Sequence, residues 1–212
     1  MARKKKQKAD KRYAYGITIP KSSHSRIRAL KKDHEPEIHG DKFWNSSYLI
    51  MDFLEKQGLP PNPSVMEIGC GWGAAGIYCA KQHQASVVGV DADPNVFPYL
   101  HLSAEMNDVS IRTRGSRFEN LKKKHLAPHD LVIGADICFW DELIDPLYAV
   151  IRKAVKAGVG QIIIADPGRP PFDEVCARCQ KKFDAQVKEW EIDNNDVKAH
   201  GWLLVVGSLS AA

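Results

Sequence analysis

The sequence lacks any apolar run that approaches the roughly 20 residues needed to cross a bilayer, so we expect no membrane-spanning segment. The first residues, from Met1 to Lys6, are basic, and no apolar stretch follows them as it would in a secretory signal. Cysteine is also scarce, and the five cysteines show no spacing typical of a disulfide framework. These absences favour a cytoplasmic protein in a reducing interior, and we expect a monomer.

Metal-ligand patterns are equally sparse. Cys176 and Cys179 have the spacing of a ligand pair, but no second pair accompanies them, and a zinc site needs about four ligands. The eight histidines show no ligand spacing. The sequence therefore predicts no metal site.

Positive charge is concentrated at one end of the chain. The formal net charge is +4, and residues 1–12 hold seven Lys or Arg and one Asp, which leaves 23 basic and 25 acidic residues elsewhere. We interpret this end as a flexible, solvated tail, with contact to nucleic acid as the alternative. Residues 1–39 would form this tail and a little-patterned arm, in which 21–32 could make a short helix. A single domain is expected to begin near Gly40 and to cover 40–212.

Apolar segments alternate with helical ones through that domain. The predicted strands cover residues 65–68, 86–91, 110–114, 130–136, 161–166, 185–192 and 202–207. A helix over 48–57 is expected to be capped by Ser46 or Ser47, and another is expected over 174–183. This alternation predicts an α/β fold with a doubly wound, mostly parallel sheet and helices on both faces. Ligands of such sheets bind beyond the carboxyl ends of the strands, and four of these ends here carry informative residues, Gly69, Asp91, Asp136 and Asp166.

The most informative stretch runs from Val65 to Gly73, where an apolar strand ends in three alternate glycines and a helical segment follows. Strand, glycine loop and helix are typical of a nucleotide-binding unit. The glycines satisfy the dinucleotide pattern in two registers, and Asp91 lies 22 positions after Gly69, about where a ribose-binding acid belongs. The loop alone leaves the choice of nucleotide open.

Glu67, two residues before the first glycine, favours a different ligand. A carboxylate repels a pyrophosphate, whereas it attracts a sulfonium and an ammonium group. S-adenosylmethionine carries both cations and no phosphate. A dehydrogenase would also need a substrate domain, which the unpatterned N-terminal residues cannot supply. We therefore expect S-adenosylmethionine as cofactor.

Residues 67–73, Glu-Ile-Gly-Cys-Gly-Trp-Gly, resemble the first motif of the seven-strand, S-adenosylmethionine-dependent methyltransferases. More narrowly, Trp44 and the Gly-Ala-Asp-x-x-Phe of residues 134–139 resemble the protein-lysine methyltransferases of that group. The resemblance, which covers about 40–207, implies a Rossmann-like fold with a seven-stranded sheet. It also implies a cofactor site made by Trp44, Glu67, Gly69, Gly71, Gly73, Asp91, Phe118 and Ala135, with Asp91 on the ribose, the glycines around the methionine end and Phe118 near the adenine.

Transfer of a methyl group to a lysine requires an aligned, deprotonated amine. Asp136 is the candidate carboxylate that orients this amine, and Phe139 with Trp140 could form an aromatic wall around it. The alternatives are a turn or helix-capping role for Asp136 and core packing for the aromatic residues. Arg169 could bind a carboxylate of a partner, or belong to a structural turn.

We therefore predict an N-methyltransferase that acts on a lysine of a protein substrate. A methyltransferase for a small, nicotinamide-like amine would use the same pocket. A nucleic-acid methyltransferase and a nucleic-acid-binding module that uses the basic tail are the remaining hypotheses.

Overall fold

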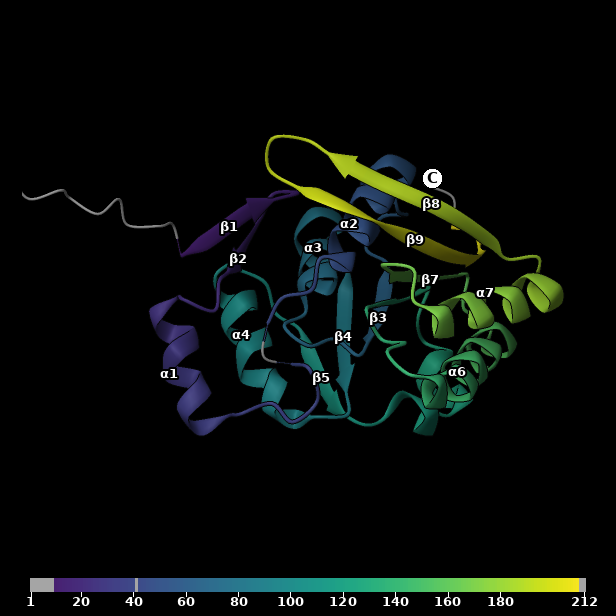
Figure 1. The fold of residues 1–212 in the computed structure, drawn as a ribbon, viewed down its shortest axis with the longest axis horizontal. Helices are drawn as coiled ribbons and strands as arrows, with labels where there is room; N and C mark the ends of the chain where they lie inside the picture. Colours follow the sequence, from purple (N-terminus) through teal and green to yellow (C-terminus); the bar gives the residue numbers. More distant parts are fainter. Residues whose placement is uncertain (1–9, 41, 210–212) are drawn as a thin grey trace, which may run out of the picture.

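The computed structural model describes residues 10–40 and 42–209, so most of the basic tail predicted over residues 1–12, namely residues 1–9, lies outside the described residues. A seven-stranded sheet forms the centre of the molecule (Figure 1). Its strands, in chain order, are β3 (Ser64–Ile68), β4 (Ser86–Asp91), β5 (Arg112–Gly115), β6 (Leu131–Ala135), β7 (Gln161–Asp166), β8 (Gln186–Asp193) and β9 (Lys198–Gly207). The spatial order is β5-β4-β3-β6-β7-β9-β8.

The first five of these strands, β3 to β7, run parallel to one another, whereas β9 is antiparallel to both β7 and β8. From β3 the chain builds outward to β5, then returns to place β6 on the other side of β3. This reversal between β3 and β6 is the topological switch point at which ligands bind in open α/β sheets. The predicted doubly wound, mostly parallel sheet is confirmed.

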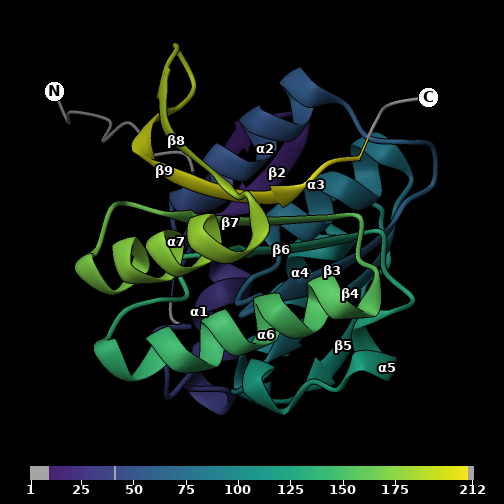
Figure 2. The same cartoon turned by 90° about the vertical axis from the view of Figure 1, so that its right-hand side faces the viewer.

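Helices cover both faces of the sheet (Figure 2). One face carries α2 (Ser46–Gln57), α3 (Ala74–His83) and α4 (Phe97–Glu105), and the other carries α5 (Lys123–Leu126), α6 (Ile144–Ala157) and α7 (Pro170–Phe183). Each face has its own apolar core, because neighbouring residues of a buried strand point to opposite faces. No helix in the described part of the chain is long and apolar enough to cross a membrane.

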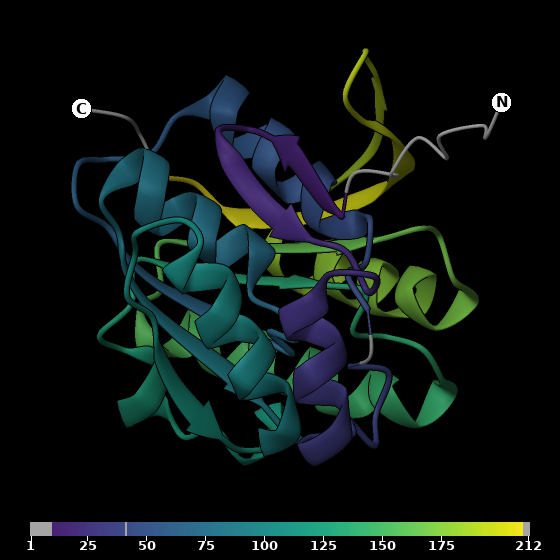
Figure 3. The same cartoon turned by 90° about the vertical axis from the view of Figure 1, so that its left-hand side faces the viewer.

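The expectation that ordered structure begins near Gly40 was wrong. A hairpin of β1 (Lys11–Ala14) and β2 (Ile17–Pro20) precedes α1 (Ser25–Asp33), which is the short helix expected within 21–32. These elements pack outside α3 and α4 (Figure 3). Ile17, Ile19 and Ile27 are buried there, and the Asn107 side chain bonds both the N–H and the carbonyl of Thr18 at 2.8 Å. Two strands of four residues each are too short for a periodic pattern to reveal.

Two predicted helix starts also differ from the structure. Helix α2 begins at Ser46, but neither serine side chain caps it. The Ser46 N–H instead donates to Oδ2 of Asp136 at 3.2 Å. Helix α7 begins at Pro170 rather than near residue 174, because a proline is well suited to the first turn of a helix.

Candidate functional site

A cavity of about 500 Å³ lies beyond the carboxyl ends of β3, β4 and β6. Its position is the one that the strand order predicts for a ligand. Of the ten residues predicted for the site, eight line this cavity: Trp44, Gly69, Gly71, Asp91, Phe118, Ala135, Asp136 and Phe139. Glu67 and Gly73 are not among its lining residues.

The glycine loop joins β3 to α3 through three glycines with positive φ, at +60° for Gly69, +49° for Gly71 and +71° for Gly73. Side chains rarely adopt this conformation. A Cβ at Gly71 would meet no atom within 4 Å, so the cavity leaves room for a ligand against this backbone. A Cβ at Gly73 would lie 2.7 Å from Cγ of Leu100, so this glycine permits close packing of α4.

Asp91 ties the end of β4 to the glycine loop. Its Oδ2 accepts from the Gly71 N–H at 2.9 Å, and its Oδ1 accepts from the Asp93 N–H at 3.0 Å. Burial raises the pKa of Asp91, whereas the backbone donors favour its charged form. A carboxylate is therefore held at the cavity wall where the sequence predicted it.

Glu67 lies behind the glycine loop rather than in the cavity. Its side chain is 3% exposed, and Oε2 accepts from the Gly76 N–H at 3.0 Å in the first turn of α3. Burial raises the pKa of Glu67 to about 8, against the opposing effect of the Gly76 and Ala75 N–H groups. In this arrangement the Glu67 carboxyl group fastens α3 to β3, which differs from the predicted contact with a cationic cofactor.

Asp136 follows β6 at a positive φ of +55°, a conformation that Asp tolerates better than most residues. Its Oδ1 accepts from Nη2 of Arg169 at 2.9 Å, and its Oδ2 accepts from the Ser46 N–H. The carboxylate thus caps α2 from a distant part of the chain while it lines the cavity. Asp136 therefore has the helix-capping role that was the alternative prediction from the sequence, and it also lies at the predicted site.

Arg169 is bonded within the chain. Its Nη1 donates to Oδ2 of Asp166 at 2.7 Å, and its guanidinium carbon lies 4.4 Å from the centroid of the Phe139 ring. The side chain is 22% exposed. These contacts give Arg169 a different role from the predicted binding of a partner's carboxylate.

Aromatic rings gather at the rim of the cavity. The Phe139 ring lies 4.7 Å from that of His39 and 5.2 Å from that of Trp44, measured between centroids. The Trp140 ring lies 5.1 Å from that of His39, and this tryptophan is 50% exposed. Phe139 and Trp140 therefore form the predicted aromatic wall, together with His39, which the sequence did not indicate.

The segment from Glu37 to Gly40 closes one side of the cavity. Its Glu37 N–H donates to Oδ2 of Asp93 at 2.6 Å, and its Gly40 carbonyl accepts from the Trp72 indole. Part of the predicted arm is thus a wall of the site. Ser116, Arg117 and Glu119 also line the cavity near Phe118, and only their position next to the predicted adenine-binding residue could have indicated them.

Within the described residues, no three His, Cys, Asp or Glu side chains cluster in a way that could hold a metal ion. The five cysteines are buried free thiols.

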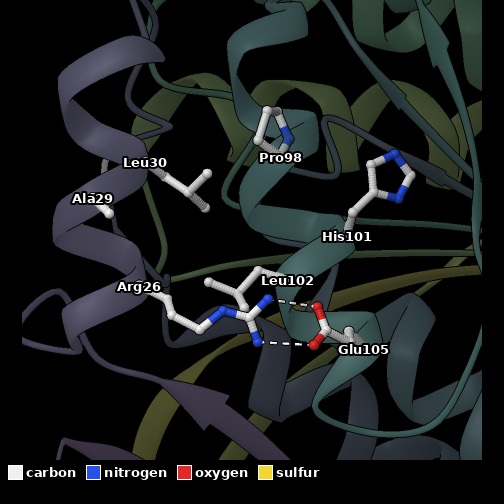
Figure 4. A pocket seen from close by; sticks show the side chains of 7 residues that line it. All are labelled: Arg26, Ala29, Leu30, Pro98, His101, Leu102 and Glu105. Atoms are coloured by element: carbon white, nitrogen blue, oxygen red, sulfur yellow. Dashed lines mark hydrogen bonds and ion pairs between the residues drawn. The ribbon is translucent and has the colours of Figure 1, made fainter.

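A second hollow, of about 330 Å³, lies between α1 and α4 (Figure 4). Nη1 and Nη2 of Arg26 donate to the two carboxylate oxygens of Glu105 at 2.8 and 2.6 Å across it. Leu30 and Leu102 supply an apolar side to this hollow. Its polar lining side chains are His101 and the paired Arg26 and Glu105, and none of the residues predicted for the site lines it, so we assign the chemistry to the larger cavity.

Solved structures share this fold. They include the human methyltransferase 10 domain containing protein (TM-score 0.59, 12% identity, 85% of this chain and 93% of the other). The methyltransferase domain of bacterial CtHen1 has a TM-score of 0.58 and 16% identity, with 77% of this chain and 99% of the other covered. The fold is that of the Rossmann-like, S-adenosylmethionine-dependent methyltransferases, as predicted.

Within this class, the chain belongs to the lysine methyltransferase family, whose model matches residues 23–190. The electron transfer flavoprotein beta subunit lysine methyltransferase of Xenopus laevis is 27% identical over 65% of this chain and 58% of its own length. The ribosomal protein L11 methyltransferase of Cupriavidus necator is 31% identical over 72% of this chain and 47% of its own. Phosphoethanolamine N-methyltransferase 1 of Arabidopsis thaliana is 26% identical over 72% of this chain and 30% of its own. The chain thus spans about a third to a little over half of these relatives.

Proposed function

We propose that this protein transfers a methyl group from S-adenosylmethionine to the side-chain amine of a lysine in a protein substrate. One observation carries the proposal: a single cavity joins the glycine loop and Asp91 to Asp136 and an aromatic rim. The family and the flavoprotein-directed relatives support a protein lysine as acceptor.

The residues present fit the cofactor. The cavity is open next to the Gly71 backbone, and the Asp91 carboxylate at its wall suits a pair of ribose hydroxyls. Phe118 lines the cavity shortly after Gly115, the β5 residue that pairs with Asp91, and would supply an aromatic face for the adenine. When bound, S-adenosylmethionine supplies a methyl group that its sulfonium already activates.

The chain's own residues would then handle the acceptor. An amine that enters the cavity beside Phe139 and Trp140 loses water, which lowers its pKa and favours the nucleophilic, neutral form. Asp136 orients it by accepting an N–H hydrogen bond, and the aromatic faces attract it while it is still charged. Asp136 would keep the lone pair of the neutral amine directed toward the methyl group that the bound cofactor presents, and the proton that the ammonium group gives up would leave to solvent.

A small amine is the second candidate acceptor, since phosphoethanolamine N-methyltransferases are among the relatives. The rim favours a larger substrate, because Trp140 and Ile38 expose 50% and 47% of their surface at the mouth. Exposed apolar residues of this kind are typical of a protein contact. A cytoplasmic location stays part of the proposal, and the five free thiols support a reducing compartment.

The test is incubation of the purified protein with labelled S-adenosylmethionine and a cell extract, used both before and after dialysis, so that small acceptors are present in one sample and removed from the other. Label in a discrete protein band, located on lysine by mass spectrometry, is the expected result. Label confined to the small-molecule fraction would instead favour the second candidate, and label in nucleic acid would overturn both.

A matched pair of variants links the activity to this cavity. Asp91→Ala should weaken S-adenosylhomocysteine binding by about 100-fold, since it removes charged hydrogen bonds worth roughly 1.5–3 kcal/mol each. Asp196→Ala, on the exposed turn between β8 and β9, should leave binding unchanged. Calorimetry that finds equal affinity in both variants would contradict the assignment.

A further inference from the structure

Arg169 connects two strand ends at the site. Its guanidinium donates to Asp136 at the end of β6 and to Asp166 at the end of β7. The Asp166 Oδ1 also accepts from the N–H groups of Gly168 and Arg169, at 3.0 and 2.8 Å. Asp166 is fully buried and Asp136 is 6% exposed, so these bonds are shielded from water.

The same guanidinium contacts the aromatic wall. Its carbon lies 4.4 Å from the centroid of the Phe139 ring, within the range of a cation–π interaction. Asp136 and Phe139 line the cavity, whereas Arg169 is not among the lining residues. Arg169 therefore acts on the cavity through these two residues, from behind them.

We propose that Arg169 is a positioning residue that partly offsets the charge of Asp136, so that this carboxylate orients a substrate amine without retaining its proton. The inference rests on the proposed function, because it concerns how that reaction handles the amine.

The charge balance of the cluster gives the physical reason. Asp136, Asp166 and Arg169 together carry a formal charge of −1. Burial raises the pKa of Asp166, and the N–H donors from Arg169 and Gly168 favour its ionised form. A carboxylate with no such compensation would attract an ammonium strongly and raise the pKa of the amine, which opposes the loss of its proton. With Arg169 in place, the attraction suffices for binding and the amine can still become neutral.

Other charged groups face the cavity from the elements around it. Apart from Asp91 at the end of β4, they are Glu37, His39, Lys42, Arg117, Glu119 and Glu142. Glu37 and His39 come from the segment Glu37 to Gly40 that closes one side of the cavity, and Lys42 lies just after it. Arg117 is ion-paired with Glu119 at 2.6 Å. These groups are common to wild type and to all variants proposed below, so they cancel in the comparison.

The test uses n-butylamine as a probe of the lysine side chain, in the presence of saturating S-adenosylhomocysteine. Arg169→Gln removes the cation and should tighten butylammonium binding at pH 7.5 roughly tenfold, the equivalent of one pKa unit. Arg169→Lys keeps the charge and should change the affinity less than threefold. Asp166→Asn removes a negative charge and should weaken binding roughly tenfold. Tryptophan fluorescence, from Trp44 and Trp140 at the rim, reports the titration.

Arg169→Gln should bind butylammonium more tightly and Asp166→Asn more weakly. General damage to the fold cannot produce these opposite changes in affinity, because it would weaken binding in both variants. Weaker or unchanged binding in Arg169→Gln, or no butylamine binding in any of the proteins, would overturn the inference. Thermal unfolding identifies a variant that does not fold. If either Arg169→Gln or Asp166→Asn fails to fold, comparison of the other variant with Arg169→Lys still shows whether loss of that charge tightens or weakens butylammonium binding.

Methyl transfer gives a second readout. With the dialysed extract as a dilute acceptor, the initial rate of labelling is proportional to kcat/KM, and its rise with pH should move up by about one unit in Arg169→Gln. An unshifted profile would count against the inference. Failure of the proposed function would show separately, as an absence of protein label in wild type while butylamine still binds.

Discussion

The indole N–H of Trp72 donates a hydrogen bond of 2.8 Å to the backbone carbonyl of Gly40. Trp72 lies within the glycine loop after β3, and Gly40 ends the segment that closes one side of the cavity. The Trp72 ring also stacks on that of Tyr99, at 5.5 Å between centroids and 4° between planes. The loop and the N-terminal wall of the site are thereby held as one structure.

Trp72→Phe should loosen this wall. The phenyl ring can preserve the stacking but cannot donate to Gly40, and the loss of one hydrogen bond is worth about 1 kcal/mol. We expect S-adenosylhomocysteine to bind roughly fivefold more weakly in calorimetry. Trp190→Phe is the control, because it loses a similar bond, to Oδ2 of Asp52, far from the cavity. Equal affinities in the two variants would contradict the role of Trp72.

Gly71→Ala and Gly73→Ala should separate ligand contact from packing. Both glycines have positive φ, which costs a substituted residue about 1–2 kcal/mol. Gly71→Ala adds a methyl group at the cavity, so its main effect should be weaker cofactor binding. Gly73→Ala also forces its methyl group against Leu100, and should lower the free energy of unfolding by about 2–5 kcal/mol in all. Chemical denaturation and calorimetry on both variants measure the two effects. If Gly71→Ala lowered the free energy of unfolding and Gly73→Ala weakened cofactor binding, the ligand would not lie against Gly71.

Glu67 should make stability depend on pH. An unfolded glutamate releases its proton near its ordinary pKa of 4.5, whereas the folded protein keeps it to about pH 8. Between these values the folded state binds more protons, so the free energy of unfolding should fall as pH rises, by at most about 1.4 kcal/mol per unit. It should level off above pH 8.

Glu67→Gln should remove this dependence, and denaturation midpoints at pH 5 to 9 test it. Glu55→Gln, at an exposed position on α2, is the control that should follow wild type. Parallel curves for wild type and Glu67→Gln would show that Glu67 is ionised throughout.

Asp136→Asn should reduce catalysis with little effect on the cofactor. The amide oxygen can still accept from Ser46 or Arg169, but it lacks the charge that orients an amine. We expect labelling to slow by about 100-fold, as when a preorganised electrostatic contact is removed. S-adenosylhomocysteine affinity should change less than threefold, and Asp141→Asn, at an exposed position, should retain full activity. Full activity in Asp136→Asn would remove this carboxylate from the mechanism.

The centre of the sheet could be predicted because β3, β4, β6 and β7 are short apolar runs with clear ends. The segment at Gln161–Asp166 is buried at every position, and the glycine loop and Asp91 follow their strands where the family pattern places them. Local sequence was sufficient for these features, because a run of adjacent apolar residues indicates a buried strand and closely spaced glycines indicate the loop that follows it.

The remaining features depend on contacts between distant residues. Ser46 receives its cap from Asp136, 90 positions away, and Glu37 is bonded to Asp93 across 56 positions. Electrostatics favoured a contact between Glu67 and a cationic cofactor. The N–H groups at the start of α3 compete with such a cofactor for the same carboxyl group, and in the structure they bind it. A single sequence does not reveal which of two partners a buried charge will take.

The place of β9 has a consequence for how the protein assembles. This strand is the last regular element of the described chain, yet it lies inside the sheet and pairs with β7 along Gln161–Asp166. Until residues 198–207 have been synthesised, the apolar edge of β7 has no partner on that side and could pair with another chain. Loss of this strand, by an early stop or by proteolysis, would therefore leave the β7 edge open to aggregation, although every residue that lines the cavity would still be present.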